Sequence, residues 1–144
     1  MSNAILNLDA ISVNFSAKDW QEAIRECGRL LLNQDLIEER YIQGMIQTVE
    51  EMGNYIVLAP GLALPHARPE QGVKKVGACI VTLQEPVDLL GKEADIFISF
   101  SAVDSDSHVE MLRGIAEVCM VEENLDAIRQ AETIGEIYTV FNQE

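Results

Sequence analysis

Only two histidines occur in the 144-residue chain, and both stand where an imidazole could do chemistry. A neutral imidazole is a good nucleophile near pH 7, and it donates one hydrogen bond while it accepts another. Pro65 fixes its own φ angle and pushes Leu64 toward an extended conformation, so His66 is expected to leave a strand along a stiff path. Ala67 is small enough to let another surface approach. The segment therefore predicts an imidazole that is aimed and reachable.

The second histidine stands at the expected start of a helix. Ser107-His108-Val109-Glu110 has the form of a capping box, which makes Ser107 the N-cap and His108 the first helical residue. Helix N-termini carry unpaired N–H groups and the positive end of the dipole, so they bind anions such as phosphate and favour a neutral imidazole. If both histidines end loops at one sheet edge, one can attack a phosphoryl group while the other holds its oxygens. The sequence does not say which ring nitrogen takes each role.

Other interpretations use the same residues. Each histidine can be a polar residue without a catalytic or binding role. His66 would then lie in an exposed loop, and His108 in the first turn of a helix. With Asp104, Asp106 or Glu110, the pair could also bind zinc, iron or manganese in a metal-dependent hydrolase. Neither histidine belongs to a compact motif such as His-Glu-x-x-His, so no metal and no other cofactor is expected. Gly-x-Ser-x-Gly and Gly-x-x-x-x-Gly-Lys are absent, which excludes the commonest hydrolase and nucleotide-binding sites.

The charge balance limits the partners. Twenty-four acidic and ten basic side chains give a formal net charge of -14, which argues against nucleic acid and anionic membranes and favours a basic protein partner. No apolar run approaches the roughly 20 residues of a membrane span, and no signal peptide is recognisable, so a cytoplasmic protein without membrane insertion is expected. Met1-Ser2-Asn3-Ala4 could include an expression scar. Cys27, Cys79 and Cys119 are odd in number and widely spaced, which favours small apolar residues over a disulfide framework.

Hydrophobic spacing predicts one layered α/β domain over residues 1–144. Helices are expected at 16–33, 38–52, from 107 onward, 123–130 and 133–141, with capping boxes at Ser16–Asp19 and Thr133–Glu136 and a stop at Gly53-Asn54. Strands are expected at 55–59, 76–83 and 94–103, the last two joined by a loop with Pro86 and Gly91. These two strands are too apolar for a wet face, so helices should cover them.

The segment around the first histidine resembles the type 2 enzyme IIA domains of the bacterial sugar phosphotransferase system. Every fixed position of that family's signature is matched, by Glu51, Leu58-Ala59 and Leu62-Ala63-Leu64-Pro65-His66-Ala67. The resemblance covers nearly the whole chain and includes the second histidine. The stretches IVLAPGLALPHARPEQGVKK and SAVDSDSHVEML are most similar to ascorbate-type members.

The resemblance implies a mixed β-sheet flanked by helices on both sides, and a phosphoryl carrier. In this family His66 would accept the phosphoryl group from the phosphocarrier protein HPr and pass it to a cysteine of a cognate IIB domain, while His108 contacts the group. Sugar specificity lies mainly in the membrane component, so ascorbate is implied only by the resemblance. The oligomeric state is not indicated, and a regulatory binding module with the same fold is an alternative.

Positive support for the phosphoryl group is expected from a different place than in some members. Several mannitol and fructose members carry an arginine just before the signature, where this chain has Thr48-Val49-Glu50-Glu51. Arg68 is expected to compensate, because a guanidinium fork fits phosphoryl oxygens, and Ser107 at the helix end, Lys74 and Lys75 would add to it. A shallow apolar docking patch is expected from Leu62, Leu64 and Met111.

Overall fold

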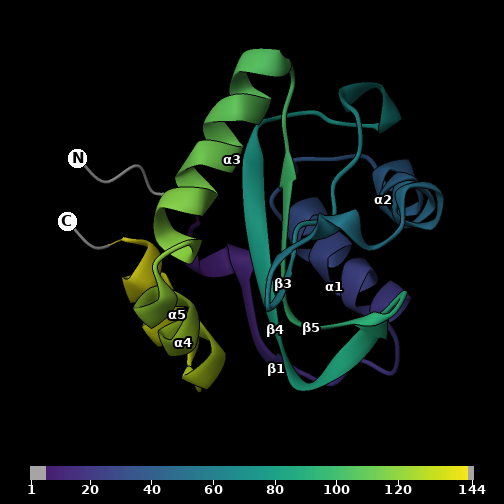
Figure 1. Cartoon of the computed structure of the whole chain (residues 1–144). Coiled ribbons are helices and arrows are strands. Elements are labelled where there is room, and N and C mark those ends of the chain that lie inside the picture. The colour runs from purple at the N-terminus through teal and green to yellow at the C-terminus, as the bar shows by residue number, and fades with distance from the viewer. Residues whose placement is uncertain (1–5, 143–144) are drawn as a thin grey trace.

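A five-stranded sheet lies between two groups of helices in the computed structural model, which describes residues 6–142 (Figure 1). The strands are β1 (Ile11–Phe15), β2 (Val57–Ala59), β3 (Gly61–Ala63), β4 (Gly77–Leu89) and β5 (Lys92–Ser101). Their order across the sheet is β1-β4-β5-β3-β2. Strands β1 and β4 pair in parallel, as do β3 and β5, whereas the other two pairs are antiparallel. The sheet is therefore mixed, as predicted.

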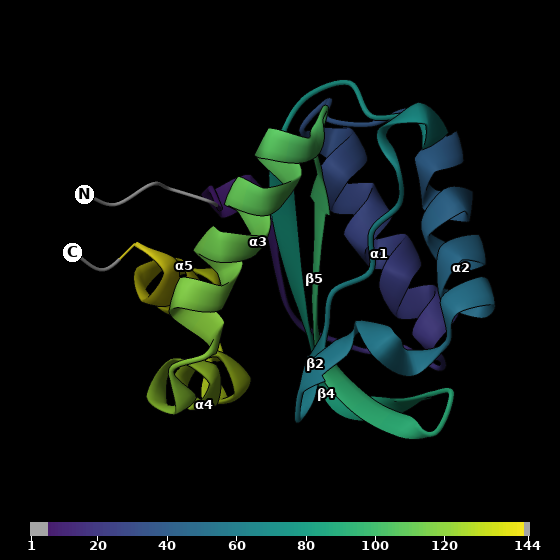
Figure 2. The same ribbon diagram turned by 45° about the horizontal axis from the view of Figure 1, so that its top comes forward.

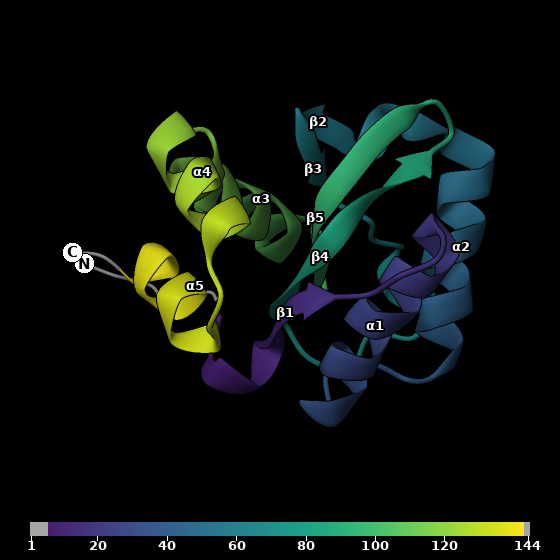
Figure 3. The ribbon, with the colours of Figure 1, turned by 90° about the horizontal axis from the view of Figure 1, so that it is seen from below.

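Helices cover both faces of this sheet. The group on one face comprises α1 (Trp20–Asn33) and α2 (Arg40–Met52), and the group on the other comprises α3 (Ser105–Cys119), α4 (Glu122–Gln130) and α5 (Ile134–Phe141) (Figure 2). Seen from below, the two groups stand on opposite sides of the long β4–β5 hairpin (Figure 3). Short 3-10 segments lie at Leu8–Ala10, Asn54–Ile56 and Pro69–Gln71. The predicted α/β fold class, with helices on both sides, is confirmed.

The helix boundaries follow their capping groups. Helix α1 begins later than predicted because the Asp19 carboxylate, not the Ser16 hydroxyl, is the N-cap and accepts a hydrogen bond of 2.8 Å from the Glu22 amide. Helix α2 begins at Arg40 and ends at Met52, with Gly53 as its C-cap, whose φ of 80° suits glycine. The last helix is confirmed in detail, with Thr133 and Glu136 forming the predicted capping box.

The strands differ more from the prediction. Strand β4 runs through Pro86 instead of ending in a loop, because a register shift between Thr82 and Val87 leaves the proline exposed at an irregularity of the ladder. The predicted strand at 55–59 is a strand only from Val57 onward. Strands β1 and β3 were missed; β3 has only three residues, too few for a periodic pattern.

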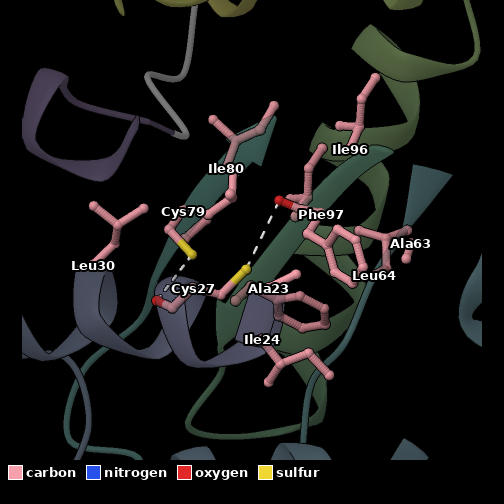
Figure 4. Packing of buried hydrophobic residues seen from close by; sticks show 14 of the residues in the cluster. Ala23, Ile24, Cys27, Leu30, Ala63, Leu64, Cys79, Ile80, Ile96 and Phe97 are labelled. Atoms are coloured by element: carbon pink, nitrogen blue, oxygen red, sulfur yellow. Dashed lines mark hydrogen bonds between the residues drawn. The ribbon is translucent and has the colours of Figure 1, made fainter. Parts of the chain in front are cut away.

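A large part of the hydrophobic core lies where α1 packs on β4 and β5 (Figure 4). Cys27 of α1 and Cys79 of β4 are fully buried there, and the Cys79 thiol donates to the Cys27 carbonyl oxygen at 3.4 Å. Cys119 is also free and buried, so all three cysteines act as small apolar residues, as predicted. No helix between residues 6 and 142 is long and apolar enough to cross a membrane.

The topology brings two loops to one edge of the sheet. Strands β3 and β5 are parallel neighbours, so their carboxyl ends lie at the same edge, where ligands and reacting groups gather in sheets of this kind. The loop after β3 carries His66, and the turn after β5 leads into α3, which carries His108. The fold thus places the two histidines near each other although they are far apart in the sequence.

A close approach of α1 and α2 generates a stability prediction. A Cβ atom on Gly28 would lie 2.3 Å from Cγ1 of Ile42, so Gly28→Ala forces the Ile42 side chain or the helices themselves to shift. We expect Gly28→Ala to lower the free energy of unfolding by about 1–3 kcal/mol in urea denaturation. Trimming the opposing side chain in Gly28→Ala/Ile42→Ala should recover part of this loss. Gly135→Ala is the control, since its Cβ would meet nothing closer than 4.0 Å; equal losses in both single variants would contradict the packing argument.

The buried carboxylate of Glu26 predicts a dependence of stability on pH. Burial alone would raise the pKa of Glu26, but hydrogen bonds from Arg29 and Ser12 and the charge of Arg29 outweigh it and hold the pKa below its ordinary value of 4.5. A lowered pKa in the folded state adds stability above pH 4.5 that is lost as the pH falls through the folded-state pKa. We expect Glu26→Gln to lower the free energy of unfolding at pH 7 by about 1 kcal/mol, a small figure because Arg29 is 54% exposed and its charge is screened.

The measurement is the difference in unfolding free energy between Glu26→Gln and the unchanged chain from pH 7 to pH 3. This difference should shrink as Glu26 becomes protonated. Glu22→Gln is the matched control, because this carboxylate lies on the same helix and only accepts a hydrogen bond from the Lys18 amide. A difference for Glu26→Gln that stays constant over the whole range would contradict the assigned linkage.

Candidate functional site

His66 is held by the backbone just before it. Leu64 and Pro65 are buried, and the Leu64 amide donates to the Ile56 carbonyl oxygen at 2.9 Å, which fixes the chain as it leaves β3. Nδ1 of His66 lies 2.8 Å from the Leu64 carbonyl oxygen. A carbonyl oxygen can only accept, so Nδ1 carries the hydrogen and Nε2 keeps its lone pair. The structure therefore distinguishes the two ring nitrogens, which the sequence could not do.

Three aromatic rings pack against one another at the site. The His66 ring stacks on Phe100 with centroids 4.8 Å apart and an interplanar angle of 27°. The His108 ring meets both of them edge-on, at 5.3 Å from His66 and 5.2 Å from Phe100. The predicted meeting of the two histidines is thus realised, and Phe100, at the end of β5, was missed by sequence reasoning. An aromatic residue where a buried strand leaves the sheet was the available signal.

Burial controls the protonation of His66. Removal of water from the ring lowers the pKa of His66 below its ordinary value of 6.5, and the nearby His108 lowers it further, while the hydrogen bond to Leu64 raises it. The lowering contributions dominate, so the imidazole is neutral at pH 7 with its Nε2 lone pair available. Such a ring can act as a nucleophile.

Helix α3 begins earlier than predicted, which corrects the role of Ser107. The N-cap is Asp104, whose carboxylate accepts a hydrogen bond of 2.8 Å from the Ser107 amide, and the Ser107 hydroxyl accepts in return from the Asp104 amide at 3.1 Å. His108 is therefore the fourth helical residue, and its amide donates to the Asp104 carbonyl oxygen. His108 can act on a ligand through its ring, whereas its backbone N–H is occupied.

The expected cations are arranged differently from the prediction. Lys74 pairs with Asp35, and Lys75 approaches the same carboxylate at 3.6 Å, so both lysines are engaged by Asp35. Arg68 is exposed two positions after His66, and its guanidinium makes no hydrogen bond or ion pair with the residues between 6 and 142. Of the three expected cations, Arg68 is therefore the one whose charged group is unpaired within residues 6–142.

The expected apolar docking patch is wrong for two of its three members. Leu62 is 0% and Leu64 3% exposed, because both belong to the core beneath the site, and only Met111 is partly exposed. The surface beside His108 is instead a cavity of about 390 Å³ lined by Pro69, Glu70, Asp104, Ser105, His108 and Val109. Its rim is acidic, as the overall charge suggests.

Two further features bear on the alternative of a metal site: the cavities and the groups of possible metal ligands. A larger cavity of about 670 Å³ lies at the opposite end of β3, where Arg129 pairs with Asp95, and neither histidine lines it. Within the described part of the chain, no group of three or more histidine, cysteine, aspartate or glutamate side chains is placed to hold a metal ion. The alternative of a metal-dependent hydrolase thus has no ligand cluster in these residues.

Known proteins share both the sequence and the fold. The Ascorbate-specific PTS system EIIA component of Escherichia coli (strain K12) is 39% identical over 140 residues, which cover 93% of this chain and 90% of that protein. The solution structure of the mannitol-specific cryptic phosphotransferase enzyme IIA CmtB from Escherichia coli is 35% identical, with a TM-score of 0.89 and 97% of each chain covered. A complex of enzyme IIAMTL with phosphorylated enzyme IIBMTL from Escherichia coli, 20% identical with a TM-score of 0.83, covers 94% of this chain and 96% of that one and shares the fold.

The family assignment extends over almost the whole chain. A family model described as "Phosphoenolpyruvate-dependent sugar phosphotransferase system, EIIA 2" matches residues 4–144. The ring pair formed by His66 and His108 lies inside this match, on a sheet of the matching topology. By sequence and by fold, the chain belongs to the type 2 EIIA family of the phosphoenolpyruvate-dependent sugar phosphotransferase system.

Proposed function

We propose that this chain is a phosphoryl carrier that accepts a phosphoryl group from phospho-HPr on Nε2 of His66 and passes it to a cysteine of a cognate IIB domain. The observation that carries the proposal is the contact of 2.8 Å between Nδ1 of His66 and the Leu64 carbonyl oxygen. It leaves Nε2 as the only nitrogen of this ring with a free lone pair. The neighbouring His108 ring supplies a polar group within reach of the phosphoryl oxygens.

The proposed transfer moves one phosphoryl group and no net proton. The lone pair of His66 Nε2 attacks phosphorus while the phosphorus–nitrogen bond of the donor histidine breaks. The imidazole gains positive charge, which the Leu64 carbonyl oxygen stabilises through the Nδ1–H group. A cysteine thiolate of the acceptor then attacks phosphorus, the Nε2–phosphorus bond breaks, and His66 returns to its neutral form. His108 stabilises the charge on the phosphoryl oxygens during both steps.

The partners and the sugar are proposed from the relatives. Ascorbate-type uptake is supported by the ascorbate-specific component that is 39% identical to this chain. A IIB partner is supported by the mannitol complex that shares the fold. The proposed place of action is the cytoplasm, where a carrier of this kind meets its donor and acceptor. The acidic rim beside His108, with Glu70 and Asp104, suits a donor with a basic face and favours rapid encounter.

The assignment of the two histidines predicts distinct variants. With phosphoenolpyruvate, enzyme I and HPr, the unchanged chain should gain the mass of one acid-labile phosphoryl group. His66→Ala should gain none, because it lacks the nucleophile. His108→Ala should still be labelled, but about 100-fold more slowly, because it lacks a group that stabilises charge in the transition state. Intact mass spectrometry over time gives both the extent and the rate.

Controls separate chemistry from folding in this experiment. Circular dichroism should show that both variants are folded, and nitrogen NMR of the labelled chain should place phosphorus on Nε2. Labelling of His66→Ala, or phosphorus found on Nδ1, would contradict the assignment. A folded unchanged chain that takes up no phosphoryl group would contradict the carrier proposal itself.

The exposed guanidinium of Arg68 generates a further prediction. Arg68 follows His66 closely and makes no ion pair with any residue from 6 to 142, so it can turn toward the phosphoryl group. We expect Arg68→Ala to slow phosphorylation about fivefold at low salt, which corresponds to about 1 kcal/mol for an exposed charge, and less as salt screens it. Arg25→Ala, which removes another exposed arginine, on α1, is the matched control. Equal rates in the two variants would exclude a role for Arg68.

A further inference from the structure

The hydroxyl group of Tyr41 lies under the loop that carries His66. Tyr41 belongs to the first turn of α2 and is 0% exposed. Its oxygen accepts a hydrogen bond of 3.0 Å from the Ala67 amide. The same oxygen lies 2.9 Å from the Phe100 carbonyl oxygen and 3.1 Å from the Ala67 carbonyl oxygen. One buried hydroxyl thus contacts the peptide after His66 and the end of β5.

These contacts link the backbones that carry the two stacked rings, His66 and Phe100. Ala67 directly follows His66, and Phe100 carries the ring on which the His66 imidazole lies, 4.8 Å away. A hydroxyl has a single hydrogen, so it donates to one carbonyl oxygen at a time, and Phe100 offers the shorter distance. Tyr41 therefore fixes the backbone under His66 relative to the backbone under Phe100.

The hydroxyl stays a donor at all physiological pH values. Burial raises the pKa of Tyr41 to about 12, with a small further increase from Cys79 and a partial offset from the Ala67 hydrogen bond. An unpaired buried hydroxyl would destabilise the fold, and here both its donor and acceptor functions are used. Deprotonation of Tyr41 therefore does not break the link between the two backbones at physiological pH.

Other contacts hold the far part of the same loop on α2 and on the residues just before it, but none of them is as close to His66 in the sequence. The Arg40 guanidinium donates to the Glu70 carbonyl oxygen at 2.8 Å, and the Glu38 amide donates to the Gly72 carbonyl oxygen at 2.7 Å. Both lie several residues beyond the imidazole. Tyr41 is the contact of α2 that acts at the residue next to His66.

We propose that Tyr41 is a positioning residue for phosphoryl transfer: its hydroxyl fixes the peptide after His66 against β5, which keeps Nδ1 on the Leu64 carbonyl oxygen and Nε2 directed outward. This inference rests on the proposed role of His66. Tyr41 touches neither the phosphoryl group nor the imidazole nitrogens, so it acts only through the backbone of Ala67 and Phe100.

The test replaces the hydroxyl and keeps the ring. In Tyr41→Phe, the Ala67 amide and the Phe100 carbonyl oxygen lose their partner, and the loop can move. We expect phosphorylation by phospho-HPr to slow about 10- to 100-fold, the range that misplacement of a reacting group by about 1 Å produces. Nitrogen NMR of the unphosphorylated chain should show His66 as a mixture of tautomers, and the pH at which it titrates should shift.

The control is a variant that weakens the same helix elsewhere. Val49 of α2 is 0% exposed and lies about two turns from Tyr41, so Val49→Ala should lower the melting temperature without changing the tautomer or the titration of His66. If Tyr41→Phe behaves like Val49→Ala, the role of Tyr41 is only structural and the inference is wrong. A changed tautomer with an unchanged transfer rate would overturn it as well.

Amide exchange of Ala67 and the tautomer of His66 test the role of Tyr41 without a transfer rate. If Tyr41→Phe does not fold, amide exchange of the unchanged chain decides, because a Tyr41 hydrogen bond must slow exchange of the Ala67 amide, and an unprotected amide would overturn the inference. If the unchanged chain takes up no phosphoryl group, the proposed function fails, whereas the tautomer of His66 still reports on Tyr41. An unaltered tautomer in Tyr41→Phe would then reject the positioning role by itself.

Discussion

The parallel pairing of β3 with β5 is the contact on which the site depends. Strand β3 has only three residues, and it is the element that delivers His66 next to the ring of Phe100. So short a strand cannot hold its own register, and the surrounding structure fixes both of its ends. At the start, Arg129 of α4 pairs with Asp95 of β5 and donates to the Pro60 carbonyl oxygen at 2.9 Å. Helix α4 thereby clamps the entry of β3 to the strand beside it.

Glycine at the start of β3 is required by this clamp. Gly61 has a φ of 80°, which side chains rarely adopt, and a Cβ there would lie 2.4 Å from both the Arg129 guanidinium and the Asp95 carboxylate. At the other end, the Leu64 amide bonds to Ile56, and α2 supports the loop from below. The imidazole of His66 therefore projects from an irregular loop that is fixed at three places: by Arg129 at the start of β3, by the hydrogen bond between Leu64 and Ile56, and by α2 below.

The sequence predicted the helices better than the strands, and the reason is length. A helix of 14 residues such as α1 repeats its apolar face several times, so its existence was clear although its start moved from Ser16 to Asp19. Strand β3 offers no repeat at all, and of the five residues of β1 only Ile11 is buried. The start of α3 was predicted three residues too late for another reason. Ser107 and Glu110 have the form of a capping box in the sequence, but in the structure Asp104 and Ser107 form the box.

The signature around His66 describes the support of the imidazole more than its chemistry. Of the residues that match it, Leu62, Ala63, Leu64 and Pro65 are buried beneath the site, and they build β3 and the turn that follows. The match therefore predicted the backbone that supports His66. Nothing within it indicates Tyr41 or Phe100, which come from other elements. Their side chains look like ordinary core residues in the sequence, since a tyrosine on an apolar helix face and a phenylalanine in a strand are common. Their place beside His66 arises from tertiary structure: α2 crosses beneath the loop after β3, and β5 ends beside it.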